Sequence, residues 1–492
     1  MCATRISAMG GREPQGAQSL PLVVDLDGTL VLSDMLHESV LALARRNPLG
    51  VPGIPFLLLR GRAGLKRALA KDFDPRPKLL PYNEPFLAWL REQRAAGRRL
   101  VLCTASDERL ATAIASHLGL FNEVLASDGE TNLGGAAKAR DLCGRYGERG
   151  FDYAGNARAD LPVWACARVA VVVNAPQSLA KATSGLCPVE RHFPAQKPGL
   201  GVYLRMLRVY QWLKNLLLVV PLAAAHRLSQ ADSWPPLILG ILSFCLCASA
   251  VYLANDLLDL ESDRRHPRKR LRAITSGRVT ILRAVGIAPV LLAGGVGLGL
   301  FVGPGFLLWL SCYFLLTCAY SLFLKRMVLV DCLTLALLYT LRIVAGGAAT
   351  GVVLTFWLLA FSMFLFLSLA FVKRYAELDA QPPEADAAVH GRGYYKDDAR
   401  LVQTLGIASG YASVLVLALY LNTAAVTRLY RTPEVVWAVV PVLLFWISWM
   451  WFKANRGEMH DDPLVFAVKD KPSLLAGLLF AAALAAGALV RL

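Results

Sequence analysis

The chain has 492 residues, of which 55% are hydrophobic, and a formal net charge of +16 from 52 Lys and Arg against 36 Asp and Glu. It is too long for one ordinary domain and too apolar for two soluble domains, so part of it must lie in a membrane. Lys and Arg gather on the cytoplasmic side of membrane spans. We therefore attribute the positive charge to membrane topology and expect no nucleic-acid partner. The ten Cys show neither metal-ligand spacing nor a disulfide framework.

The first part of the chain has the character of a soluble domain. Residues 1–19 are polar, lack the apolar core of a signal peptide and are expected to form a flexible tail. Between residues 20 and 194, β-branched runs alternate with amphipathic helical stretches, which predicts an α/β domain with a parallel sheet and helices on both faces. Strands are expected at residues 20–25 and in RRLVLCTAS, VLASDG and RVAVVVNAP, and a small helical cap at residues 36–78.

Polar residues follow the predicted strands, at the edge of a parallel sheet where active sites form. Those that follow three of the strands are Asp25, Asp27, Thr104, Ser106, Asn156 and Asp160. Asp25 can attack a phosphorus atom and form an aspartyl phosphate, while Asp27 can protonate the leaving group and then activate water. Carboxylate and carbonyl oxygens suit Mg²⁺. These residues therefore predict a phosphoryl-transfer site.

Four motifs in this part resemble those of the haloacid dehalogenase superfamily of phosphotransferases: DLDGT at 25–29, LCTAS around Thr104, GGAAKARD around Lys138 and GNARAD at 155–160. The resemblance implies that Thr104 and Lys138 hold phosphate, and that Mg²⁺ binds to Asp25, Asp27, Asn156 and Asp160. The family usually has an aspartate where this chain has Asn156, which predicts a weaker metal site. The alternative is a catalytically inactive domain retained for folding or assembly.

The second part of the chain is expected to be an all-α membrane bundle. A linker is predicted at residues 195–208, and a bundle of nine transmembrane helices at 209–492. The nine apolar runs are 209–225, 237–257, 281–301, 304–323, 328–349, 354–373, 402–422, 435–452 and 474–490. Lys and Arg are concentrated in the loops after the even-numbered spans. The positive-inside rule then predicts a multi-pass inner-membrane protein with a cytoplasmic N-terminal domain and the C-terminus on the opposite side.

A row of carboxylates followed by a basic cluster lies at the end of the second predicted span. On a helix, Asn255, Asp259 and Asp263 fall at i, i+4 and i+8, with Asp256 one position round, so several oxygen ligands share one face. Such a face suits Mg²⁺ shared with a diphosphate. The alternative is a solvated helix end paired with the arginines that follow. Polar clusters in YSLFLKRMVLVD, FVKRYAELD and HDDPLVFAVKDKP lie in loops on the same side, which predicts one reaction chamber facing the cytoplasm.

The motif NDLLDLESD at 255–263 resembles the first aspartate-rich loop of the UbiA superfamily of intramembrane prenyltransferases, which are nine-helix bundles. The second aspartate motif of that family is not clear in this chain. Instead, RVYQWLKN, YSLFLKRMVLVD, LRIVAGGAATG and FVKRYAELD resemble the branch that makes decaprenylphosphoryl-phosphoribose. In that branch phosphoribosyl diphosphate is the donor and a polyprenyl phosphate is the nucleophile.

This resemblance implies a Mg²⁺-dependent phosphoribosyl transfer with Asp256 and Asp259 as catalytic residues. Mg²⁺ and diphosphate are assigned to Asn255, Asp256, Asp259 and Asp263. The polyprenyl phosphate or the departing pyrophosphate is assigned to Lys214, Arg264 and Lys325, and the phosphoribose to Arg272, Lys373, Arg374 and Tyr375. Asn215 and Tyr320 are further substrate-binding positions.

The two parts together predict a bifunctional enzyme. Transfer in the bundle would be followed by removal of the 5-phosphate in the α/β domain, giving polyprenylphosphoryl-ribose, a pentose donor for the cell envelope. Hydrolysis of the released pyrophosphate is a second role open to that domain. Two alternatives remain: a prenyltransferase that joins a prenyl diphosphate to an aromatic or quinone precursor, and a transporter or lipid-binding protein with a regulatory soluble domain. A homo-oligomer is left open.

Overall fold

The computed structural model describes residues 20–59, 61–380, 393–424, 426, 430–459 and 462–489. The chain divides into two units. The first comprises Met1–Tyr203 and Asp256–Val285, and the second comprises Leu204–Asn255 and Gly286–Leu492. The predicted tail at 1–19 and the last residue of the ninth predicted span lie outside the described residues.

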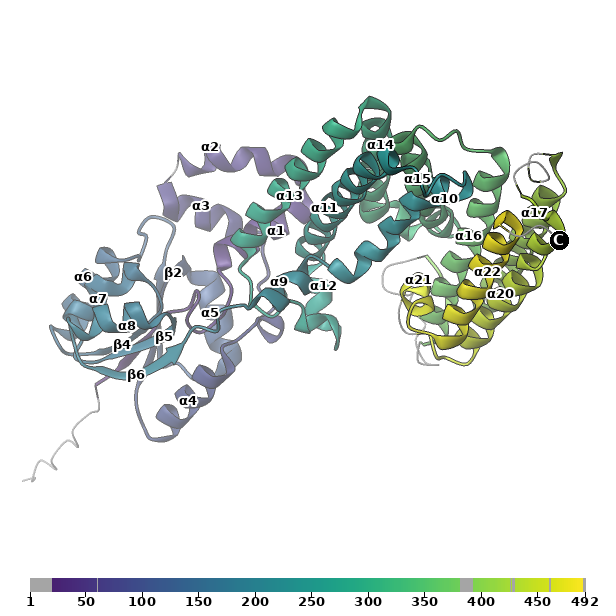
Figure 1. Ribbon diagram of the computed structural model, residues 1–492. Helices are drawn as coiled ribbons and strands as arrows, with labels where there is room; N and C mark the ends of the chain where they lie inside the picture. Colours follow the sequence, from purple (N-terminus) through teal and green to yellow (C-terminus); the bar gives the residue numbers. More distant parts are fainter. Residues whose placement is uncertain are drawn as a thin grey trace, which may run out of the picture. The chain divides into compact units, whose positions relative to one another are not determined.

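The first unit contains a six-stranded sheet in the order β3-β2-β1-β4-β5-β6, and all of its strand pairs are parallel (Figure 1). The strands are β1 Leu22–Val24, β2 Leu100–Asp107, β3 Glu123–Ser127, β4 Asp152–Gly155, β5 Ala170–Ala175 and β6 Val189–Pro194. The predicted parallel α/β sheet is confirmed. Two strands are not among the four named from the sequence: β4, which was only implied as the strand before Asn156, and β6. β6 was missed because its sequence VERHFP is polar and its side chains are mostly exposed or half-buried.

Helices cover both faces of this sheet. Alternate residues of a strand point to opposite faces: Leu22 and Val24 belong to one buried cluster and Val23 to another. The segment predicted as a helical cap contains α1 Met35–Arg46, η1 Pro48–Gly53, α2 Ile54–Leu58, α3 Gly61–Ala70 and η2 Pro77–Leu79. The remaining helices of the domain are α4 Glu84–Ala95, α5 Glu108–Leu118, α6 Ala136–Tyr146, η3 Arg158–Asp160, α7 Leu161–Cys166 and α8 Gln177–Ser184.

Two segments differ from the expectation for the middle of the chain. The predicted linker contains a helix, α9 Leu200–Met206. The acidic and basic stretch after the second predicted span forms α12 Leu260–Arg265 and η6 Lys269–Leu271, and it belongs to the α/β unit instead of the helical unit.

The second unit is helical. Among the described residues, eight helical segments are long and apolar enough to cross a membrane. They contain α11 Trp234–Leu258, α13 Ile281–Val302, α14 Pro304–Leu322, α15 Val330–Thr350, α16 Phe356–Asp379, α17 Ala399–Leu421, α20 Val439–Asn455 and α22 Lys471–Leu489. Shorter elements are η4 Val209–Val219, α10 Val220–Ala224, η5 Ala231–Ser233, η7 Leu324–Arg326, η9 Lys396–Asp398, α19 Pro433–Val436 and α21 Pro463–Ala467.

The first of the nine predicted spans is not among those eight. Val209–Ala224 is a shorter apolar helix, and a spanning α-helix needs about 20 residues. Most of this segment is a 3₁₀-helix, and it carries Lys214 and Asn215 as buried polar side chains. The chain is thus a multi-pass membrane protein with eight clear spans among its described residues, and the first of the nine predicted spans is not confirmed.

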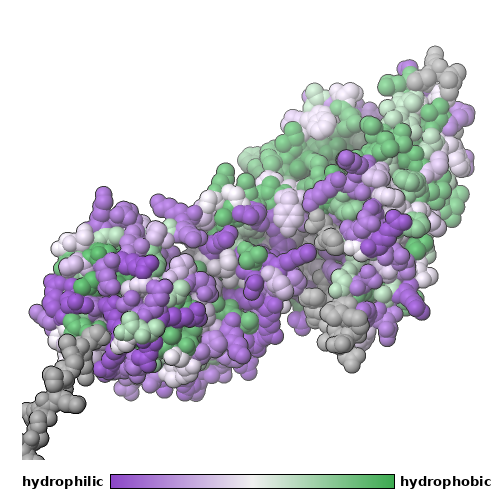
Figure 2. All heavy atoms as spheres, turned by 90° about the horizontal axis from the view of Figure 1, so that it is seen from below, coloured by the Kyte–Doolittle hydropathy of each residue, from purple (hydrophilic) through white to green (hydrophobic). Residues whose placement is uncertain are grey.

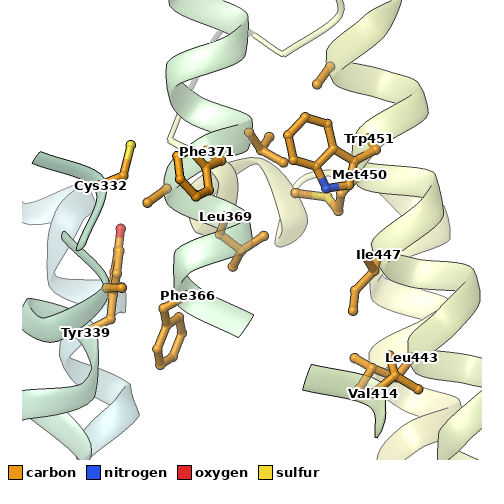
Figure 3. Close-up of a cluster of buried hydrophobic side chains, with 14 of the residues drawn as sticks. Cys332, Tyr339, Phe366, Leu369, Phe371, Val414, Leu443, Ile447, Met450 and Trp451 are labelled. Atoms are coloured by element: carbon orange, nitrogen blue, oxygen red, sulfur yellow. The ribbon is translucent and has the colours of Figure 1, made fainter. Parts of the chain in front are cut away.

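The largest buried cluster lies in the second unit, where Phe371, Ile447 and Trp451 pack between α16, α17 and α20 (Figure 3). Hydrophobic side chains also cover much of the surface of this unit, as expected for helices that contact lipid (Figure 2). Close approach of α17 requires glycine: a Cβ built on Gly406 would lie 2.2 Å from Cζ2 of Trp451. Ser368 Oγ of α16 donates to the carbonyl of Gly406 over 2.7 Å, which joins α16 to α17 at the same position.

This packing predicts different effects for two glycine-to-alanine changes in apolar helices. Gly406→Ala forces a methyl group into Trp451 and should lower the free energy of unfolding by about 1–3 kcal/mol. Gly297→Ala is the matched control, because among the described residues no atom outside its own stretch of helix lies within 4 Å of its Cβ position, and alanine favours a helix. Thermal unfolding in detergent would measure both. Equal melting temperatures for the two variants would contradict the packing described.

Candidate active sites

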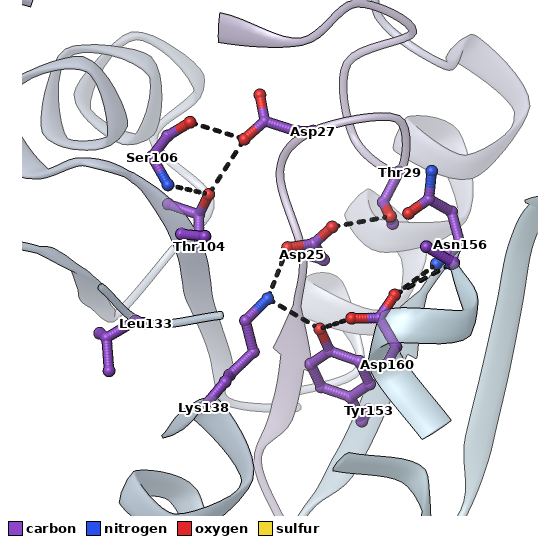
Figure 4. A network of polar contacts seen from close by, with 12 residues as sticks. Asp25, Asp27, Thr29, Thr104, Ser106, Leu133, Lys138, Tyr153, Asn156 and Asp160 are labelled. Atoms are coloured by element: carbon purple, nitrogen blue, oxygen red, sulfur yellow. Dashed lines mark hydrogen bonds and ion pairs between the residues drawn. The ribbon is translucent and has the colours of Figure 1, made fainter. Parts of the chain in front are cut away.

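The first site lies at the carboxyl end of β1, where Asp25 is buried (Figure 4). Lys138 of α6 donates from Nζ to Asp25 Oδ1 over 2.7 Å and to the Tyr153 hydroxyl over 2.9 Å. Thr29 Oγ1 lies 3.3 Å from Asp25 Oδ2. Burial lowers the pKa of Lys138, but the charges of Asp25 and Asp160 and the hydrogen bond to Asp25 are among the contacts that together raise the pKa above the ordinary value of lysine, so the ammonium stays charged. The predicted pair of a nucleophile and a phosphate-binding lysine is therefore assembled.

Asp27 faces the predicted phosphate-binding hydroxyl group. Its Oδ2 accepts from Ser106 Oγ over 2.6 Å and from Thr104 Oγ1 over 3.3 Å, and its Oδ1 accepts from the amide of Met35 at the start of α1. Burial and the nearby Asp34 raise the pKa of Asp27 to about 7. A carboxyl group that carries a proton near neutral pH suits a general acid.

The helical segment after β1 also reaches this edge of the sheet. Lys66 of α3 donates from Nζ to the carbonyl of Ala105 over 2.6 Å and to Asn132 Oδ1 over 3.0 Å. Lys66 and Tyr153 were missed by sequence reasoning. A lysine in an amphipathic helix and a tyrosine in a buried strand carry no local signal that the lysine reaches the end of β2 or that the tyrosine contacts Lys138.

The four predicted Mg²⁺ ligands of this domain do not converge on one point. The carboxylate of Asp160 accepts hydrogen bonds from the Tyr153 hydroxyl and from the amides of Asn156 and Ala157, at 2.9–3.1 Å. Asp160 thus fixes the loop that follows β4, while the carboxylate of Asp27 is turned toward Thr104 and Ser106 (Figure 4). In the described ranges no three Asp, Glu, His or Cys side chains are grouped to hold a metal ion.

Asp25 and Asn156 are the side chains that fit a Mg²⁺ ion. Asn156 lies against Gly28, where a Cβ atom would come within 2.0 Å of its Nδ2, and the φ of +76° at Gly28 also demands glycine. Within the described residues the Asn156 side chain makes no hydrogen bond. Its amide oxygen, together with Asp25 Oδ2, gives the oxygen donors that Mg²⁺ prefers. Because Asn156 replaces the usual aspartate, the site has less negative charge, but position 156 still offers an oxygen atom as a metal ligand.

The predicted diphosphate loop forms a second polar cluster in the first unit. Arg272 Nη1 donates to Asp256 Oδ1 over 3.0 Å and to Asp263 Oδ2 over 2.5 Å. Both carboxylates are buried, and burial raises the pKa of Asp263. Asp256 and Asp263 are thus brought together as predicted, while Arg272 bridges them instead of standing apart for phosphoribose.

The single helical face expected for this motif is wrong. α11 ends at Leu258 and α12 begins at Leu260, because the backbone leaves helical geometry at Asp259. Asn255 remains in α11, where its Nδ2 donates to Ser321 Oγ over 2.9 Å. Arg264, assigned to a lipid phosphate or pyrophosphate, is paired with Glu38 of α1 instead. The i, i+4, i+8 spacing places these side chains on one face only if a single helix continues through Asp259.

A third cluster lies inside the helical unit. Lys214 Nζ donates to Asp462 Oδ2 over 2.7 Å, the Tyr339 hydroxyl lies 3.2 Å from both carboxylate oxygens, and Lys373 Nζ lies 3.7 Å from Oδ2. Burial raises the pKa of Asp462, but the charges of Lys214 and Lys373 outweigh it and lower the pKa to about 2. Two predicted substrate-binding lysines from distant helices therefore meet around one carboxylate.

Arg342 extends this cluster deeper into the unit. Its Nε donates to Asn215 Oδ1 over 2.9 Å and its Nη2 to the Tyr313 hydroxyl over 3.0 Å, and it lies against the rings of Tyr313 and Tyr339. Asn215, a predicted substrate-binding residue, thereby belongs to the same cluster. Sequence reasoning missed Arg342, although an arginine inside an apolar helix is itself a sign of function.

Arg374 and Tyr375 serve helix packing. Arg374 is fully buried and pairs with Asp331 and Glu377, and Tyr394 donates to Asp331 over 2.6 Å. Tyr375 donates to Asn455 Oδ1 over 2.9 Å. Neither residue is placed to bind phosphoribose, because Nη1 and Nη2 of Arg374 and the Tyr375 hydroxyl are bonded to side chains of α15, α16 and α20. The remaining predicted positions, Tyr320 and Lys325, lie in α14 and in η7.

The Lys214–Asp462 pair predicts a stability effect. Asp462→Asn leaves the buried ammonium of Lys214 without its carboxylate and should lower the free energy of unfolding by about 3 kcal/mol or more. Because the pKa of Asp462 is depressed, this contribution is present above the ordinary pKa of aspartate and is lost only as the pH falls toward 2.

The matched control is Glu458→Gln, which removes an ion pair with Lys453 at a carboxylate that is 46% exposed. It should leave the melting temperature nearly unchanged. Equal melting temperatures of Asp462→Asn and the wild type in detergent at neutral pH would contradict the buried pair.

The fold and these clusters define a multi-pass membrane protein that carries a phosphohydrolase-like α/β domain. Residues 216–469 match the model of the UbiA prenyltransferase family, and residues 22–164 match that of the haloacid dehalogenase-like hydrolases. The chain therefore belongs to the UbiA prenyltransferase family and carries a haloacid dehalogenase-like domain at its N-terminal side. Both resemblances found in the sequence are confirmed.

Three relatives are similar over different parts of the chain. "Uncharacterized protein y4nM" of Sinorhizobium fredii is 38% identical over 95% of this chain and 90% of that protein. "Nodulation protein NoeC" of Azorhizobium caulinodans is 35% identical over 57% of this chain and 91% of that protein. Decaprenyl-phosphate phosphoribosyltransferase of Corynebacterium glutamicum is 37% identical over 36% of this chain and 54% of that protein.

Proposed function

We propose that the chain transfers 5-phosphoribose from phosphoribosyl diphosphate to a polyprenyl phosphate and then removes the 5-phosphate of the product. The observation that carries the first step is the cluster of Lys214, Lys373 and Arg342 inside the helical unit. Lys214 and Arg342 are buried and Lys373 is half-buried. Cationic groups held among apolar helices suit a phosphorylated ligand. The similarity to a decaprenyl-phosphate phosphoribosyltransferase supports the same choice.

In the transfer step, an oxygen of the lipid phosphate attacks the anomeric carbon of the ribose. The bond from that carbon to the diphosphate breaks, and pyrophosphate leaves with the bonding electrons. Mg²⁺, when bound, neutralises the departing pyrophosphate. Asp256 and Asp263 are the carboxylates that would hold it, and Arg272, which donates to both of them, would bind phosphate oxygens. No general base is needed, because a phosphate is already ionised at neutral pH.

In the hydrolysis step, Asp25 attacks the phosphorus of the 5-phosphate and Asp27 gives its proton to the departing 5-hydroxyl oxygen. Asp27 then takes a proton from the water that hydrolyses the aspartyl phosphate. Lys138 and Thr104 would hold the phosphoryl oxygens during both stages. We place this chemistry and the loop on the cytoplasmic side, since Lys and Arg are concentrated in loops on one side of the predicted spans.

The transfer step is tested with membranes, Mg²⁺, a polyprenyl phosphate and phosphoribosyl diphosphate labelled in the ribose carbons. The wild type should move label into the lipid fraction, and Asp256→Asn should reduce the initial rate by about 100-fold or more. Glu92→Gln, an exposed change in α4, should leave the rate unchanged. Transfer of label from a prenyl diphosphate instead would identify an ordinary prenyltransferase.

The hydrolysis step is tested by Asp25→Asn in the same assay. The labelled lipid should then accumulate in its phosphorylated form, because the nucleophile is absent. Chromatography of the lipid fraction before and after treatment with an unrelated phosphatase separates the two products. An unchanged ratio of the two lipids in Asp25→Asn would remove the α/β domain from this step.

A further inference from the structure

A buried ion pair joins the helical segment after β1 to the proposed diphosphate loop. Arg264 of α12 donates from Nη1 to Glu38 Oε2 over 3.1 Å and from Nη2 to Oε1 over 2.6 Å. The side chains are only 7% and 6% exposed. Two charges removed from water in this way are stable only with good geometry, and the loss of either partner leaves an uncompensated buried charge.

Glu38 is itself fixed to the nucleophile loop of the α/β domain. Ser33 Oγ donates to Glu38 Oε1 over 2.5 Å, and Asp34 caps the N-terminus of α1. The first amide of that helix, from Met35, donates to Asp27 Oδ1. The carboxylate that holds Arg264 is thus one helical turn from a residue that binds Asp27.

Arg264 is in turn adjacent to the carboxylates of the proposed transferase. It follows Asp263 in α12, and Asp263 shares Arg272 with Asp256. The position of Arg264 therefore sets the position of one of the two carboxylates that would hold Mg²⁺.

Two further contacts fix the same loop to the α/β domain. Glu261 pairs with Arg45 at 3.0 Å and with Arg76. Gly277, with a φ of +74°, lies so close to Leu32 that a Cβ on it would be 2.5 Å from Cβ of Leu32. The loop is therefore held at three points on the segments that follow the nucleophile.

We propose that Glu38 is a positioning residue for the transferase: through Arg264 it holds the loop in the shape in which Asp256 and Asp263 bind Mg²⁺ and the diphosphate of the donor. The inference rests on the proposed function of this loop. It gives the α/β domain a second role that does not depend on its own chemistry. It also explains why Arg264 is not available to a substrate phosphate.

The test compares Glu38→Gln with Glu92→Gln in the full-length protein. Glu38→Gln should raise the KM for phosphoribosyl diphosphate and the Mg²⁺ concentration for half-maximal transfer by about tenfold or more, while Glu92→Gln changes neither. The double change Glu38→Arg with Arg264→Glu should recover most of the loss. If Arg264→Glu alone raises the KM, and the double change raises it by just as much, then Arg264 binds substrate directly. That result would overturn the proposal.

A second readout is independent of activity. Trypsin should cleave after Arg268, Lys269 or Arg270 about tenfold faster in Glu38→Gln than in Glu92→Gln, because the released loop opens more often. Equal cleavage rates, or an unchanged KM in folded Glu38→Gln, would overturn the positioning role. A wild-type protein that transfers no label from phosphoribosyl diphosphate would overturn the proposed function, and the proteolysis result would still decide whether Glu38 holds the loop.

Discussion

Buried charges must be paired, and this constraint determines where the polar side chains of the chain lie. Lys138 is buried against Asp25, and Lys214 is buried against Asp462. Each pair gives up hydration that only close geometry and further hydrogen bonds can replace. In both pairs a tyrosine hydroxyl supplies one of those bonds. Under the proposed function, a substrate phosphate that enters either site would meet a buried cation whose position is already fixed by its carboxylate partner.

The same constraint shows why local patterns predicted some residues and not others. The first strand and DLDGT could be read from sequence, because a buried β-branched run and a short loop carry their own signal. Local sequence does not distinguish a structural arginine from one in a candidate site. Arg374 and Arg342 both lie in apolar helices, but Arg374 pairs with Asp331, whereas Arg342 belongs to the cluster around Lys214. Such partners are far away in sequence, so only the folded chain reveals them. β6 was missed for the opposite reason: its polar edge position leaves no hydrophobic pattern.

The loop at Asp256–Val285 is where sequence and structure differ most. Its motif resembles one of a membrane enzyme, yet its contacts assign it to the α/β unit. The pair of Glu38 and Arg264 is separated by 226 residues along the chain, so no local pattern could indicate it. If Glu38 positions this loop as we propose, the fusion of two domains does more than deliver a product from one site to the next. The α/β unit would then also hold the loop that carries Asp256 and Asp263.

Transfer and dephosphorylation, as we propose them, act in sequence on one lipid. The most direct measurement of this order is a single-turnover time course with phosphoribosyl diphosphate labelled only in its 5-phosphate, in membranes that contain a polyprenyl phosphate and Mg²⁺. We expect label to enter the lipid fraction first and then to be released as inorganic phosphate at the same rate at which labelled lipid disappears. Release of inorganic phosphate before any label reaches the lipid, or label that stays in the lipid indefinitely, would contradict the sequence of two steps.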